Sequence, residues 1–327
     1  MSRYSTAKLQ KEGFELIELY DSACSGKAAI IPQIGNNVIA FECWGHQVIL
    51  PPTNMNAFMS DTDNHTKYGT PILFPPNRVK NGTIHFNDRI YTLPINEPPD
   101  HHLHGDIPRK AWDVVEYGSS EERGAYLSCR FDFAAHPEMM AYFPHELSFI
   151  VTHTLHEGRL TMEIKVTNHG TVIAPFALGL HPYFVIPDAD NHENILTVPT
   201  ELEWPVNNKA FATGLPSNTT FCENLKKGIS LTDYPELGCS LIEVAEGDRT
   251  CHIELKKSGY RIAYQVDKCF PFLLLFKPNW ASAISLEPYT YVTDAFNLPY
   301  DYELTGAKGI EAGEELSFNT AMWVELI

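Results

Sequence analysis

The sequence is poor in positive charge. It carries 24 Lys and Arg residues against 41 Asp and Glu residues, and the formal net charge is −17. This balance argues against binding to nucleic acid or to an anionic membrane surface, because either would be repelled. It disfavours a polyanionic substrate for the same reason.

Long hydrophobic runs and an apolar leader are also missing. The longest apolar run, residues 270–276, contains Pro271 and is too short to cross a bilayer. Residues 1–13 are charged and have no apolar core of a secretory signal. The seven cysteines are scattered without a Cys-x-x-Cys pair, as is typical of reduced thiols in a reducing compartment. We therefore expect a soluble cytoplasmic protein.

Short segments rich in aromatic and β-branched residues are separated by turn residues, which favours a β protein. Strands are expected at residues 14–20, 28–32, 37–42, 44–50, 71–74, 84–86, 89–93, 112–117, 126–133, 147–155, 160–166, 240–244, 251–256, 261–266, 272–276, 284–290, 314–318 and 322–326. The best helical candidate is residues 137–142, and residues 53–64 read as a surface loop. Neither a repeat nor a linker is visible, so we expect one large antiparallel β-sandwich domain over residues 1–327.

Two ionisable residues stand before a proline at the end of a strand-like segment. His181 precedes Pro182, and Glu287 follows an apolar run and precedes Pro288. Either residue alone could be a hydrogen-bonded structural residue. Together with His104 they would supply a base and an acid to one concave site, because an imidazole titrates near neutral pH.

Three histidines lie within four positions, at His101, His102 and His104. A His-x-His spacing on a strand places two imidazoles on one face, as in metal sites. A metalloenzyme is therefore an alternative, and its further ligands would be Glu287 and His181.

Four segments carry a family resemblance by their order and rough spacing. They are Asn77-Arg78, Leu103-His104-Gly105, His181-Pro182-Tyr183-Phe184 and Leu286-Glu287-Pro288. This ordered set resembles the aldose 1-epimerase (galactose mutarotase) family, and residues 287–290 with 294–297 are similar to a less-studied branch of it. The resemblance implies a large antiparallel β-sandwich with a sugar cleft across one sheet.

The resemblance also implies roles for individual residues. Glu287 matches the family's catalytic base, His181 its acid, and His104 a second histidine on the side of the ring oxygen. Arg78 matches the substrate-binding arginine. Asp233, in Leu231-Thr232-Asp233-Tyr234, is the nearest counterpart of an aspartate that holds sugar hydroxyls, although no histidine follows it.

Asn77 and Tyr183 complete the expected substrate-binding set, and either Tyr183 or Trp280 would stack on the sugar. The segment around His181 departs from the commoner Asn-His-x-Tyr-Phe form, since Leu180 precedes the histidine. The usual preference for galactose and glucose therefore does not transfer directly.

The implied activity is interconversion of the α and β anomers of a reducing sugar, without a cofactor or a metal. One alternative is a carbohydrate-binding protein on the same fold that does not turn its ligand over. Another is a hexose-phosphate 1-epimerase, for which Arg78 and Lys80 would have to hold the phosphate.

Overall fold

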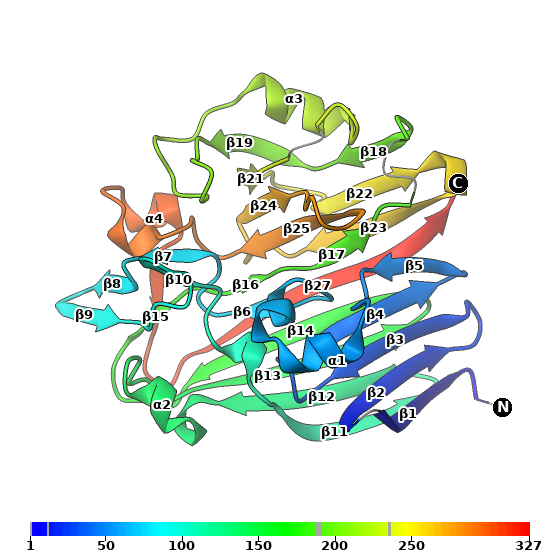
Figure 1. Cartoon of the computed structure of the whole chain (residues 1–327), viewed down its shortest axis with the longest axis horizontal. Helices are drawn as coiled ribbons and strands as arrows, with labels where there is room; N and C mark the ends of the chain where they lie inside the picture. The colour runs from blue at the N-terminus through cyan, green and yellow to red at the C-terminus, as the bar shows by residue number, and fades with distance from the viewer. Residues whose placement is uncertain (1, 12, 188–190, 235–236) are drawn as a thin grey trace.

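Two large antiparallel sheets build most of the molecule. The computed structural model describes residues 2–11, 13–187, 191–234 and 237–327. A 12-stranded sheet has the order β1-β2-β3-β4-β5-β17-β25-β24-β21-β19, with β16 beside β25 and β6 beside β16. A 9-stranded sheet has the order β11-β12-β13-β14-β27-β23-β22-β18-β20. Figure 1 shows β1 to β4 at one side of the molecule and β19 with helix α3 at the opposite side.

The strands of the 12-stranded sheet are β1 (Tyr4–Lys11), β2 (Phe14–Asp21), β3 (Gly26–Ile31), β4 (Asn37–Cys43), β5 (His46–Ile49), β6 (Ile72–Leu73), β16 (Gly179–Leu180), β17 (Tyr183–Val185), β19 (Thr200–Trp204), β21 (Ser240–Val244), β24 (Phe272–Phe276) and β25 (Ala283–Tyr289). Those of the 9-stranded sheet are β11 (Asp113–Ser120), β12 (Gly124–Asp132), β13 (Leu147–His156), β14 (Arg159–Asn168), β18 (Asn194–Thr197), β20 (Ile229–Ser230), β22 (Thr250–Leu255), β23 (Tyr260–Val266) and β27 (Glu315–Leu326).

Three small two-stranded sheets and a few short helices complete the described structure. The small sheets pair β7 (Arg78–Lys80) with β10 (His101–Leu103), β8 (Thr83–Phe86) with β9 (Arg89–Thr92), and β15 (Ala174–Phe176) with β26 (Lys308–Ile310). The α-helices are α1 (Met55–Ser60), α2 (Pro137–Met140), α3 (Thr220–Lys227) and α4 (Tyr302–Thr305). The 3₁₀ helices are η1 (Thr62–Thr66), η2 (Ile107–Arg109), η3 (Phe133–Ala135), η4 (Lys256–Ser258) and η5 (Ala295–Asn297).

The core lies between the two large sheets. Along β14 every second side chain, at residues 160, 162, 164 and 166, is buried while those between them are more exposed. This alternation follows from the period of two along a strand and leaves one face of the sheet for packing. Phe184 of β17 meets Tyr264 of β23 with ring centroids 5.1 Å apart, which joins the centres of the two sheets.

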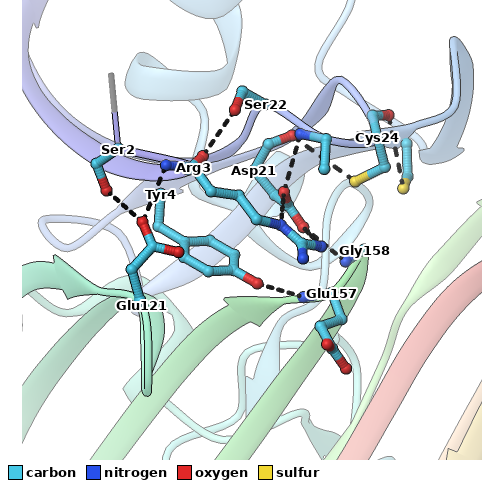
Figure 2. A network of polar contacts seen from close by, with 11 residues as sticks. Ser2, Arg3, Tyr4, Asp21, Ser22, Cys24, Glu121, Glu157 and Gly158 are labelled. Carbon is cyan, nitrogen blue, oxygen red and sulfur yellow. Dashed lines mark hydrogen bonds and ion pairs between the residues drawn. The ribbon is translucent and has the colours of Figure 1, made fainter.

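A buried carboxylate ties the edges of the two sheets together. Asp21, at the end of β2, accepts hydrogen bonds from the Arg3 side chain at 2.8 and 3.0 Å. It also accepts from the backbone N–H of Ala23 and, across the sandwich, from that of Gly158 in the turn between β13 and β14 (Figure 2). Burial opposes ionisation of Asp21, but these donors outweigh it and lower its pKa.

Most of the predicted strands are confirmed, and so is the all-β sandwich. Residues 53–64 were expected to be a loop, and that expectation is wrong: they contain α1, whose first turn is capped by the Asn54 side chain at 3.0 Å from the Ala57 N–H. Residues 314–318 and 322–326 belong to one long strand, β27. The strand β1 and the helix α3 were not predicted.

All seven cysteines lie in the described ranges and are free thiols. Among the helices of those ranges, none is both long enough and apolar enough to span a membrane.

The Asp21 network generates the first prediction. Asp21→Asn should lower the free energy of unfolding by about 2 kcal/mol, because a buried acceptor of several hydrogen bonds loses its charge. Arg3→Ala should cost less, since Arg3 is about one-third exposed and Asp21 keeps its backbone donors. Urea unfolding curves of both variants measure this, and equal losses would contradict it.

Candidate active site

A pocket of about 310 Å³ opens over the middle of the 12-stranded sheet. Its floor comes from adjacent strands, with Glu287 from β25, Leu274 and Phe276 from β24, and Tyr183 from β17. The remaining lining residues come from loops and from the small β7–β10 sheet: Thr66, Lys67, Asn77, Arg78, Leu103, His104, His181, Asn208, Cys239 and Trp280.

Strand alternation places Glu287 on the pocket side of the sheet. Ser285, Glu287 and Tyr289 occupy every second position of β25 and therefore share one face. The strand is hydrogen-bonded on both sides, with Leu274 opposite Glu287 and Tyr183 opposite Ser285. The carboxylate thus stands on a central strand rather than on a loop, which fixes its position.

His181 and Glu287 are in direct contact. The Nε2 atom of His181 lies 3.3 Å from Oε1 of Glu287, and both side chains are almost fully buried. Ser285 Oγ lies 2.9 Å from the carbonyl oxygen of Pro182, to which it donates, and 2.8 Å from His181 Nδ1. Because its proton is used, Ser285 accepts from Nδ1–H, and in the neutral imidazole Nε2 is left as the acceptor that faces Glu287.

Burial makes this pair share a single proton around neutral pH. It raises the pKa of Glu287 to about 8, against the opposing effects of the hydrogen bond from Tyr289 and of the Arg78 charge. Burial also lowers the pKa of His181 to about 3. Between those limits the pair is neutral overall and carries one proton, which these two shifts place on the carboxylate.

His104 is held next to this pair as a neutral donor. Its backbone N–H donates to the carbonyl oxygen of Asn77 at 2.9 Å, and the Asn77 N–H donates to His104 Nδ1 at 3.2 Å. With Nδ1 occupied as an acceptor, the proton of the neutral ring sits on Nε2. Burial and the neighbouring His181, whose ring centroid is 5.2 Å away, lower the pKa of His104 well below its usual value.

The backbone at Asn77 and His104 has unusual φ angles, and the contacts around it explain them. Asn77 and His104 both have positive φ angles, 55° and 64°. Gly105 follows at φ +66°, and a Cβ atom there would come within 1.9 Å of the Phe74 carbonyl oxygen. Only glycine allows this close approach, and the approach lets the segments around Asn77 and His104 form hydrogen bonds with each other.

Arg78 is fixed by a paired carboxylate. Its Nε and NH2 atoms donate to the two oxygens of Glu97 at 2.7 and 2.6 Å, and NH1 donates to the Lys209 carbonyl at 3.3 Å. This fork orients the guanidinium at the pocket wall and neutralises its charge.

Aromatic rings form one wall and part of the rim. Tyr183 stacks on His181 with centroids 4.6 Å apart, and Trp280 lies 5.5 Å from Tyr183. Trp280 is 41% exposed, which leaves ring surface available at the mouth of the pocket.

The structure brings six of the seven predicted site residues to this pocket: Glu287, His181, His104, Arg78, Asn77 and Tyr183. It places Asp233 elsewhere. That side chain is 66% exposed, and its carboxylate lies 3.9 Å from Nδ1 of His192.

The other two histidines of the cluster turn away from His104. His101 contacts Asp100 and the edge of Phe211, and His102 Nδ1 lies 2.6 Å from the Pro94 carbonyl oxygen. Within the described ranges no three His, Cys, Asp or Glu side chains gather as a metal site would require.

Three residues of the site were missed from the sequence. Ser285 and Tyr289 flank Glu287 at two residues on either side, so strand alternation alone could have indicated them. Glu97 gave no such signal, because it meets Arg78 through the fold of a loop.

Comparisons with known proteins find a matching family and similar folds. A family model described as aldose 1-epimerase matches residues 18–323. The uncharacterized protein YihR of Escherichia coli (strain K12) is 32% identical over 149 residues, which is 44% of this chain and 45% of that protein. The chain thus matches less than half the length of that curated relative.

Solved structures share the fold. A galactose mutarotase-like protein from Clostridium acetobutylicum has a TM-score of 0.89 at 22% identity, with 98% of each chain covered. Galactose 1-epimerase from Lactobacillus acidophilus NCFM has a TM-score of 0.77 at 14% identity, with 100% of this chain and 99% of that chain covered.

The raised pKa of Glu287 predicts a pH-dependent stability. In the unfolded chain Glu287 ionises near its usual pKa of 4.5, so the folded state binds the extra proton up to about pH 8. Stability from this proton is fully present below pH 4.5 and is lost as pH rises through 8. Between pH 6.5 and 8 the free energy of unfolding of the wild type should therefore fall by about 1.5 kcal/mol more than that of Glu287→Gln.

Denaturant unfolding of the two proteins at several pH values measures this difference. In the unfolded chain His181 still titrates near pH 6.5, but both proteins contain this histidine, so its contribution cancels in the difference between them. Parallel stability curves over this window would contradict the assigned direction.

Proposed function

Because the chain belongs to the aldose 1-epimerase family, we propose that it interconverts the α and β anomers of a reducing sugar by acid–base opening and reclosure of the ring. The observation that carries the proposal is the buried contact between His181 Nε2 and Glu287 Oε1 at 3.3 Å, on the floor of a pocket lined by hydrogen-bond donors and aromatic rings.

The shared proton fits the needs of the reaction. Ring opening requires a base to take the proton of the C1 hydroxyl and an acid to give one to the ring oxygen. The pair starts with Glu287 ionised and His181 protonated, and ends with Glu287 protonated and His181 neutral. These are two tautomers of one protonation state, so each half-reaction moves protons without drawing any from solvent.

The proposed proton transfers balance in ring opening and in ring closure. As the C1 oxygen gives its proton to Glu287, the bond between C1 and the ring oxygen breaks, and the ring oxygen takes the proton from His181. The product is the open aldehyde with a free hydroxyl. Rotation about the C1–C2 bond and the reverse transfers then close the ring as either anomer.

The neighbouring residues would bind and orient the sugar. The Nε2–H of His104 is a donor that cannot transfer its proton readily, so it suits polarisation of the ring oxygen beside His181. Arg78 presents a fixed guanidinium to sugar hydroxyls. The exposed face of Trp280 or the ring of Tyr183 would stack on the apolar face of the sugar.

A sugar phosphate has less support at this site. Arg78 is already neutralised by Glu97, and Lys80 lines a different pocket together with His85 and Asn297. The two cations suggested for the phosphate therefore do not converge here.

The proposal predicts that Glu287→Gln lowers the catalysed rate of anomer exchange by about 10²- to 10⁴-fold, because the amide keeps the shape of the site but cannot accept the proton. Saturation-transfer NMR on a panel of reducing sugars measures the exchange. Glu243→Gln is the matched control, since Glu243 is a partly buried glutamate outside the pocket, hydrogen-bonded to Trp204.

The outcomes of this assay distinguish three interpretations. Exchange accelerated by the wild type and by Glu243→Gln but not by Glu287→Gln supports the epimerase. Sugar binding without acceleration by the wild type would instead indicate a carbohydrate-binding protein, and full activity in Glu287→Gln would remove Glu287 from the mechanism.

The shared proton also predicts how the catalysed rate depends on pH. The pair holds its one proton between about pH 3 and pH 8, from the pKa values of His181 and Glu287. We expect kcat/KM to be level through the neutral range and to fall about tenfold per pH unit above pH 8, where the pair has lost the proton that the ring oxygen needs. Initial rates corrected for hydroxide-catalysed exchange measure it, and a profile still rising at pH 9 would contradict it.

A further inference from the structure

We infer that Tyr289 is a positioning residue that stabilises the ionised form of the Glu287 carboxylate, the form from which the proposed reaction starts. The catalytic part of this inference rests on the function proposed above, whereas the contact between Tyr289 and Glu287 is independent of that function. Tyr289 has no assigned role in the resemblance, and it is absent from the pocket lining.

Tyr289 contacts the carboxylate on the side away from His181. Its hydroxyl donates a hydrogen bond to Oε2 of Glu287, the oxygen that does not face His181. Tyr289 itself is completely buried. A sugar in the pocket would therefore touch Glu287 but not Tyr289, and any effect of Tyr289 on the chemistry has to pass through Glu287.

The Tyr289 ring packs so closely against β16 that its partner residue there has to be glycine. Gly179 pairs with Tyr289 across β16 and β25. A Cβ atom on Gly179 would lie 2.5 Å from Cδ1 of Tyr289 and 2.5 Å from Cβ of Pro76. The same short segment that delivers His181 thus carries the glycine that Tyr289 requires, so the acid and the support of the base are placed together.

Asn77 connects Tyr289 with the second histidine. Its side chain acts on the Tyr289 phenol and opposes the rise of the phenol pKa, while its backbone N–H donates to His104 Nδ1 at 3.2 Å. Burial, followed by the charge of Glu287, raises the pKa of Tyr289 well above its usual value. The phenol therefore keeps its proton and remains a donor across the working pH range.

The other groups around Glu287 do not duplicate this role. The titratable and charged residues that face it from the surrounding elements are His181, Tyr183, Tyr289, Cys239 and Arg78. His181 is its proton partner, and Tyr183 and Cys239 are neutral and add no positive charge. Arg78 acts at longer range with its charge offset by Glu97, and Ser285 is occupied by Pro182 and His181.

Removal of the donor has a defined consequence. In Tyr289→Phe the ionised carboxylate loses its hydrogen bond while the protonated form loses little, so the proton stays on Glu287. The tautomer with Glu287 ionised and His181 protonated becomes rarer. We expect kcat to fall about 10- to 100-fold with KM nearly unchanged, and the alkaline fall in activity to move to higher pH.

The decisive experiment titrates Glu287 without any sugar. Infrared spectra of the wild type and of Tyr289→Phe are recorded across pH 5–10, and the carboxylic acid band of Glu287 is identified as the one missing from Glu287→Gln. The titration midpoint should move to higher pH in Tyr289→Phe. Tyr291→Phe is the matched control, because it removes another buried tyrosine hydroxyl, one that donates to the Pro76 carbonyl at 2.9 Å and not to Glu287.

The outcomes separate the inference from the proposed function. A shifted midpoint in Tyr289→Phe but not in Tyr291→Phe supports the positioning role even if no sugar is turned over. An unshifted midpoint overturns it even if the wild type is an active epimerase. If Tyr289→Phe does not fold, fluorinated tyrosine is incorporated at position 289. Its stronger donor should move the midpoint to lower pH, and no movement overturns the inference.

Discussion

Burial of one proton between a carboxylate and an imidazole is the constraint on which this site depends. Two separate charges would be costly in the interior, whereas Glu287 and His181 together need carry none. The same burial favours the neutral tautomer, with the proton on Glu287, over the ion pair from which the proposed reaction starts. The polar neighbours then act on different members of the pair, since Ser285 fixes the imidazole tautomer and Tyr289 supports the carboxylate.

The sheet and the loops contribute differently to this arrangement. Glu287 stands on the central strand β25, which is hydrogen-bonded to β17 on one side and to β24 on the other, and His181 lies between β16 and β17. His104 directly follows the short strand β10 and Arg78 begins β7, and they are held by the reciprocal Asn77–His104 hydrogen bonds and by the Arg78–Glu97 fork. Backbone strain at Asn77 and His104 is tolerated because these contacts over-determine it.

The strands and the residues on the pocket floor can be predicted from the sequence, because alternation and turn residues are local signals. Tyr289 could be anticipated from Glu287 by the same alternation. Local signals fail where contacts are made over distance. Glu97 meets Arg78 only once β7 and β10 have paired. Asp233 has a plausible sequence context but lies on the surface beside His192, since no local pattern tells which way its loop turns.

The division between floor and rim has a functional consequence. A buried glutamate with a raised pKa destabilises the fold as pH rises, so the proposed proton transfer, rather than stability, would account for a glutamate on this central strand. The rim residues Thr66, Lys67, Asn208 and Trp280 carry no part of the proton relay. Under the proposed function, loop changes there could alter which sugar hydroxyls are held without moving the shared proton, so sugar selectivity and ring opening could vary independently.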